Sequence, residues 1–161
     1  MNIRQIPFLL IGLALLVLAG LMAFRADQVE APTTPESGTG VKPGSNDFAY
    51  ENASGDNITV ELPFPGAVVG KKFSVIGEAR GTWYFEASFP VVLLDRYGKI
   101  LTQTPAQAQG EWMTNDFVPF KADLSSPGSY EGPATLVLKK DNPSGLPQND
   151  ASISFPITIE Y

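Results

Sequence analysis

The side chains that could do chemistry in this chain are carboxylates, hydroxyls, lysines and arginines, because its 161 residues include neither cysteine nor histidine. There is therefore no thiolate nucleophile, no histidine-based triad, and no histidine or cysteine ligand for zinc. Paired carboxylates such as Glu78 and Glu86 are the groups that a glycoside hydrolase uses, but nothing in the sequence places these two in one cleft. We predict that the protein is not an enzyme and binds no cofactor.

Aromatic and acidic side chains instead suggest a binding surface. In an extended strand over residues 81–91, Trp83 and Phe85 would lie on one face, and Tyr84 and Glu86 on the other. We expect the Trp83 face to be buried and the Tyr84 face to be exposed. Further polar and aromatic residues follow in two later loops. The predicted ligand or partner surface consists of Tyr84, Glu86, Trp112, Asp116, Asp141 and Asn142.

Several loop residues carry the oxygen atoms that calcium prefers. They do not have the spacing of a known calcium loop, and Asp and Asn are also ordinary turn formers. We therefore predict no metal site. The residues concerned are Asp116, Asp141, Asn142, Asn149 and Asp150.

The charge of the chain argues against nucleic acid as a partner. The formal net charge is -6, and the basic residues do not form a stripe or patch. Neutralising a phosphate backbone requires clustered lysine and arginine side chains. We predict no nucleic-acid binding.

The N-terminal segment has the character of a membrane anchor. Every residue from 6 to 24 is apolar, glycine or proline, between Arg4 and Arg25. A helix of that length spans roughly 28 Å, close to the ~30 Å of bilayer hydrocarbon. We predict a transmembrane anchor over residues 1–25, an uncleaved signal-anchor with the C-terminal domain on the extracytoplasmic side. A cleavable signal peptide is the alternative, although the apolar run is longer than usual for one.

Residues 26–55 are rich in Pro, Gly and Ser, contain five acidic residues and show no sustained hydrophobic periodicity. This composition is typical of a flexible linker. We therefore place the domain boundary at residue 56.

Residues 56–161 contain short alternating runs separated by turns, which is the pattern of an all-β domain. About seven strands in about 105 residues predict an immunoglobulin-like antiparallel β-sandwich. Residues 91–94 are continuously apolar instead, which is typical of a strand buried on both faces. The alternating residues are Ile58, Val60 and Leu62; Phe73, Val75, Gly77 and Ala79; Val118, Phe120, Ala122 and Leu124; Ala134, Leu136 and Leu138; and Ile153, Phe155, Ile157, Ile159 and Tyr161.

Three motifs in this region point to a family. They are GTWYFEASFPV at residues 81–91, GEWMTNDF at residues 110–117 and KDNPSG at residues 140–145. Together they resemble the immunoglobulin-like domain of bacterial spore germination proteins, one of the Gmad domains, and the similarity covers about residues 57–161. The resemblance implies an extracytoplasmic β-sandwich of the bacterial envelope with a binding role, and it supplies no catalytic residues.

These observations lead to one expected function and two alternatives. We expect a single-pass protein of the bacterial cell membrane, anchored through residues 6–24, whose outer domain binds another envelope protein. The first alternative is a module that binds cell-wall glycan, because Trp83, Trp112 and Tyr84 could stack on sugar rings. The second is a structural spacer, or a domain that forms homo-oligomers through its edge strands.

Overall fold

The structure is a computed structural model that describes residues 47–161. The predicted anchor and residues 26–46 of the predicted linker lie outside this part of the chain. Within it, no helix is long and apolar enough to cross a membrane. Its helical structure consists of two short 3-10 turns, Gly81–Trp83 and Pro147–Asn149.

The described residues form nine strands, more than the seven expected from the sequence. The all-β prediction is confirmed. The strands are β1 (Ala49–Glu51), β2 (Ile58–Leu62), β3 (Val68–Val69), β4 (Lys72–Arg80), β5 (Ser88–Asp95), β6 (Ile100–Ala108), β7 (Phe117–Ser125), β8 (Gly132–Lys139) and β9 (Ser152–Ile159).

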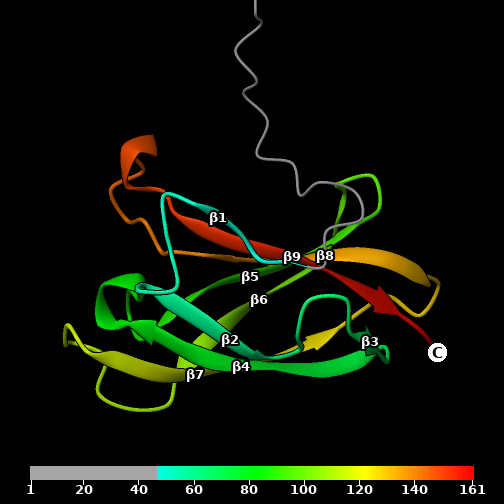
Figure 1. The fold of residues 1–161 in the computed structure, drawn as a ribbon, viewed down its shortest axis with the longest axis horizontal. Helices are drawn as coiled ribbons and strands as arrows, with labels where there is room; N and C mark the ends of the chain where they lie inside the picture. Colours follow the sequence, from blue (N-terminus) through cyan, green and yellow to red (C-terminus); the bar gives the residue numbers. More distant parts are fainter. Residues whose placement is uncertain (1–46) are drawn as a thin grey trace, which may run out of the picture. The chain divides into compact units, whose positions relative to one another are not determined.

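The strands belong to one curled sheet in the order β1-β9-β8-β5-β6-β7-β4-β2, and β3 pairs with β9. All neighbours are antiparallel except β3 and β9. Strand β6 pairs with β5 along most of its length but with β7 only at Gln107 and Ala108. The sheet therefore turns over at β6 and forms two facing layers, with β9, β8 and β5 in one and β2, β4 and β7 in the other (Figure 1).

The core lies between these layers and follows the predicted alternation. In β7, Val118, Phe120, Ala122 and Leu124 are all buried, and the residues between them are exposed. The predicted inward residues of β8, and those of β9 up to Ile159, are buried as well, and the residues between them are half-buried. Each Val, Leu, Ile or Phe in this set contributes roughly 1.5 to 3 kcal/mol when fully buried. The predictions for Leu62 and Tyr161 were wrong, because both side chains are mainly exposed.

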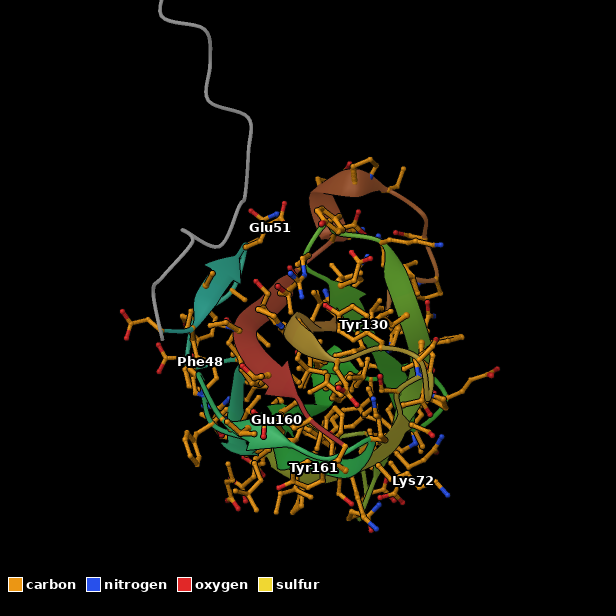
Figure 2. The ribbon with its side chains drawn as sticks, turned by 90° about the vertical axis from the view of Figure 1, so that its right-hand side faces the viewer. Phe48, Glu51, Lys72, Tyr130, Glu160 and Tyr161 are labelled. Carbon is orange, nitrogen blue, oxygen red and sulfur yellow. The ribbon has the colours of Figure 1, made fainter. Side chains whose placement is uncertain are left out.

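Strand β1 extends the sheet into the segment that we assigned to a linker. Its residues pair with β9, from Ala49 opposite Ser154 to Glu51 opposite Ser152. Just before it, the Phe48 ring meets the Phe155 ring edge-on, with 5.0 Å between centroids. Figure 2 shows Phe48 just before β1 and Glu51 at the end of β1, with the strand beside β9. The ordered domain thus begins before residue 56.

Two strand edges that could pair with another chain are interrupted. The register of β2 on β4 skips Glu61, and the register of β6 on β5 skips Leu101, so each strand carries a bulge. Pro105 also removes a backbone donor from β6. Bulges, charges and prolines are the features by which native proteins prevent edge-to-edge association. These features hinder pairing of another chain with β2 and with the free part of β6.

Candidate functional site

Four loops meet at one end of the domain, on the left in Figure 1 and away from the C-terminus. They connect β1 to β2 (residues 52–57), β4 to β5 (81–87), β6 to β7 (109–116) and β8 to β9 (140–151). We call this region the loop end. It contains all three motifs on which the family resemblance rests.

The loop over residues 81–87 is not the regular strand that we predicted. Gly81–Trp83 form a 3-10 turn, and β5 begins only at Ser88. The Gly81 amide donates to the Asp116 carbonyl oxygen over 3.1 Å, and a Cβ atom at Gly81 would clash with the carbonyl oxygens of Trp112 and Thr114. Only glycine allows this close approach. The first two motifs therefore pack backbone against backbone.

A tight turn over residues 85–88 forms the tip of this loop. The amides of Phe85 and Ser88 donate to each other's carbonyl oxygens over 3.0 and 3.1 Å. The two central residues, Glu86 and Ala87, have φ angles of 50° and 60°. Two such residues in succession are typical of a type I′ turn, which favours Asn-Gly because other side chains are strained there. As a result Phe85 is 42% exposed, contrary to the prediction that it is buried.

Tyr84 is buried, and the prediction that it lies on the exposed face was wrong. Its side chain is 5% exposed, and its hydroxyl donates to the Val118 carbonyl oxygen over 2.7 Å. Burial raises the pKa of Tyr84 far above its ordinary value. The change from strand to 3-10 turn explains the reversal, because it takes Tyr84 inward and Phe85 outward.

The two tryptophans do not form an exposed aromatic platform. Trp83 is 2% exposed and meets the Phe89 ring edge-on at 6.4 Å between centroids, as the prediction of a core residue required. Trp112 is half-buried and packs against the core cluster. Of the three aromatic residues in the glycan hypothesis, only Trp112 retains accessible ring surface.

The third motif is joined to the first through the backbone. The Asp141 amide donates to the Trp83 carbonyl oxygen over 3.0 Å. The Asn142 side-chain amide donates to the Leu146 carbonyl oxygen over 2.9 Å and to Asp150 Oδ1 over 2.7 Å. Both residues are half-buried, so they shape this loop from within.

Arg80, at the end of β4, links two further loops. Its Nε donates to the Asp56 carbonyl oxygen over 2.9 Å, and its NH1 group donates to the Asn115 carbonyl oxygen over 3.2 Å. Its guanidinium lies 4.1 Å from the centroid of the Phe117 ring, which is a cation–π contact. The hydrogen bonds hold the 52–57 and 109–116 loops against the end of β4.

The loop end is strongly acidic. Its four loops carry six carboxylates and one lysine, a formal charge of −5 compared with −6 for the whole chain. Within residues 47–161, no group of three or more acidic residues is arranged to hold a metal ion. The charged residues of the four loops are Asp56, Glu86, Glu111, Asp116, Lys140, Asp141 and Asp150.

The structure therefore places all six predicted surface residues at one end of the domain, with Glu86 and Asp116 exposed and Tyr84 buried beneath them. Sequence reasoning missed the exposed apolar residues of the same loops, which are Phe85, Met113 and Leu146. Hydrophobic periodicity assigns such residues to the core. The one signal in the sequence that residues 81–87 do not form a regular strand was the glycine at position 81.

A curled antiparallel sheet with a closed core and several loops gathered at one end defines an immunoglobulin-like domain, a fold that is not typically catalytic. The chain belongs to the Gmad2 family, the immunoglobulin-like domain of bacterial spore germination, whose model matches residues 57–145. No curated protein matches the chain. Strand β9 lies beyond the matched residues, although it belongs to the same sheet.

Proposed function

We propose that the protein is a membrane-anchored, extracytoplasmic module of the bacterial cell envelope that binds another envelope protein through its loop end. The family supports a non-catalytic interaction role. The apolar run at residues 6–24 supports the anchor.

The observation that carries the assignment to the loop end is the turn at residues 85–88. Residues held in the left-handed region cost of order 1–3 kcal/mol each, and such strain concentrates at functional sites. Here the strain keeps Phe85 and Glu86 in solvent at the tip of the first motif. The burial of Trp83 and Tyr84 weighs against the glycan alternative, since buried rings are not available to stack on sugars.

The test is site-specific photo-crosslinking in bacterial cells, with a photoreactive residue at Phe85 of the full chain. Tyr161, which is 87% exposed at the C-terminus, gives the matched control position at the other end of the domain (Figure 1). We expect a discrete protein adduct from position 85 and none from position 161. Equal labelling from both positions, or no protein adduct at all, would contradict binding through the loop end.

The anchor has a separate test. We expect the full chain to sediment with membranes and to resist extraction at high salt, and a chain without residues 1–25 to be released. Accessibility to protease added outside spheroplasts reports the side on which the domain lies. A protected domain would contradict the extracytoplasmic assignment.

A further inference from the structure

The outer face of the layer formed by β1, β9, β8, β5 and β6 carries a second feature, distinct from the loop end. A hollow of about 610 Å³ lies on this face. Strand β1 forms one side of it, and the turn after β5 together with Ile100 forms the other. Its volume falls in the range of ~300 to 1,000 Å³ that is usual for ligand sites.

The strand registers arrange the floor of the hollow in rows across the strands. One row runs from Ala49 through Ser154 and Val137 to Val92. The next contains Thr135, Leu94 and Ile100. In these two rows, the hydroxyl groups belong to Ser154 on β9 and Thr135 on β8, and the larger aliphatic side chains belong to Val137 on β8, Val92 and Leu94 on β5, and Ile100 on β6.

The sequence of β5 is that of a strand covered on both faces. Val91 and Leu93 point into the core and are fully buried. Val92 points the other way and is not part of the core cluster, yet it is only 4% exposed, and it lines the hollow. Leu94 is half-buried beside it. Continuous apolar strands of this kind normally have a second layer of structure over them.

Charge and area define what fits over this floor. The two rows carry no charge, and the four charged residues that line the rest of the hollow cancel. With a third row that contains Glu51, Ser152 and Lys139, the five strands cover roughly 19 by 14 Å, or about 270 Å². A standard protein interface needs about 800 Å² from each partner, so this face is too small for a second folded domain.

The hydroxyl groups distinguish a peptide from a lipid chain. An acyl chain laid over Thr135 and Ser154 would bury their hydroxyls without partners, which is costly. An extended peptide offers backbone groups to those hydroxyls and aliphatic side chains to Val92 and Val137. Because strands rise ~3.3 Å per residue, about six residues cross the face.

We propose that this hollow binds a short, uncharged, aliphatic peptide segment in an extended conformation. The site does not depend on the loop end. The outer face of the other layer has a smaller hollow of about 330 Å³, lined by residues 72–74 and 123–125, and presents charged side chains, including Glu78, Lys121 and Asp123.

The test uses the full chain in lipid nanodiscs and a fluorescent, end-capped hexapeptide of alternating valine and threonine, with fluorescence anisotropy as the readout. We expect saturable binding below millimolar peptide. The variant Val137→Lys should weaken binding at least tenfold, because it places an ammonium group on the floor. The matched control is Ile76→Lys, which changes a half-buried, outward-facing residue on the other layer and should leave the affinity within twofold.

Ser154→Lys gives a second, independent change to the same floor and replaces Val137→Lys if that chain does not fold. The proposal is overturned if the wild-type chain does not bind the peptide at millimolar concentration. It is equally overturned if the floor variants and Ile76→Lys behave alike, or if a hexapeptide of alternating aspartate and lysine binds as tightly.

Discussion

The Tyr84 hydroxyl is a single polar group that joins two elements inside the domain. It donates to the Val118 carbonyl oxygen and so ties the start of the 85–88 turn to β7. A buried hydrogen bond adds only modestly to stability. Removal of one partner is more costly, because the other partner then stays buried without a hydrogen bond. This residue therefore has a structural role, and its replacement tests that role directly.

We expect Tyr84→Phe to lower the free energy of unfolding by about 1–3 kcal/mol, because the Val118 carbonyl loses its donor. Urea denaturation followed by tryptophan fluorescence measures the change. An unchanged free energy would mean that water replaces the hydroxyl. Such a result would contradict the buried geometry seen at this residue.

The same residue predicts a pH dependence. Because its pKa in the folded protein is raised above 10.0, the folded state holds the phenolic proton more tightly than the unfolded state. This contribution to stability is complete below pH 10 and decreases as the pH rises above it. We expect the stability difference between wild type and Tyr84→Phe to shrink above pH 10, by at most about 1.4 kcal/mol per pH unit. A constant difference from pH 8 to pH 11 would refute the raised pKa.

At the scale of elements, the 85–88 turn stores strain that a better turn sequence removes. We expect the double variant Glu86→Asn and Ala87→Gly to have a free energy of unfolding about 1–2 kcal/mol higher than wild type, because Asn-Gly suits a type I′ turn. The gain should appear in thermal and urea unfolding. If the loop end is the binding surface, the same variant should crosslink less partner from position 85.

The hairpin after β5 supplies the opposite change as a control. Gly98 has a φ of 80° and no atom near the position of a Cβ. Gly98→Ala should therefore lower the free energy of unfolding by about 1 kcal/mol through backbone strain alone. If neither the Glu86→Asn and Ala87→Gly variant nor Gly98→Ala changed the free energy of unfolding, backbone strain would not determine the stability of these two turns.

Gly81 holds the first two motifs together, so an added methyl group should separate them. We expect Gly81→Ala to lower the free energy of unfolding by about 1–3 kcal/mol or more, because the methyl group clashes with two backbone carbonyl oxygens, which cannot move as a side chain can. Gly110, the first residue of the second motif, has open space around it, so Gly110→Ala should be nearly neutral. If Gly81→Ala and Gly110→Ala changed the free energy of unfolding equally, the close packing at Gly81 would not be the reason for the loss.

The strands and the loop end differ in how far the sequence predicts them. In β7 the alternation from Val118 to Leu124 predicted both the strand and its buried face, since each residue obeys the pleat. In the loop at residues 81–87 the same rule failed. No Asn or Gly marks Glu86 and Ala87 as turn residues, and the close approach at Gly81 depends on a partner about thirty residues away. Periodicity contains no information on such contacts.

At the scale of the whole domain, β9 is indispensable although it lies outside the residues that the family model matches. It contributes four buried side chains, at Ile153, Phe155, Ile157 and Ile159. At roughly 1.5 to 3 kcal/mol each, their sum is comparable to the ~5–15 kcal/mol stability of a typical domain.

We therefore expect a chain that ends at residue 145 to lack the cooperative unfolding transition of the full chain. Circular dichroism and thermal melting provide the measurement. Tyr161→Ala is the control, because its side chain is 87% exposed. A cooperative melt of the shortened chain would show that the other strands suffice for the core.

The position of β9 also sets the order in which the domain can assemble. Strands β1 and β3 both pair with β9, more than eighty residues further along the chain. A polypeptide made from its amino end has no partner for either strand until β9 has left the ribosome. Contacts that distant close slowly, and unpaired edges invite aggregation meanwhile. The domain should therefore complete its sheet only after β9 has emerged, and a chaperone that shields the earlier strands should raise its yield.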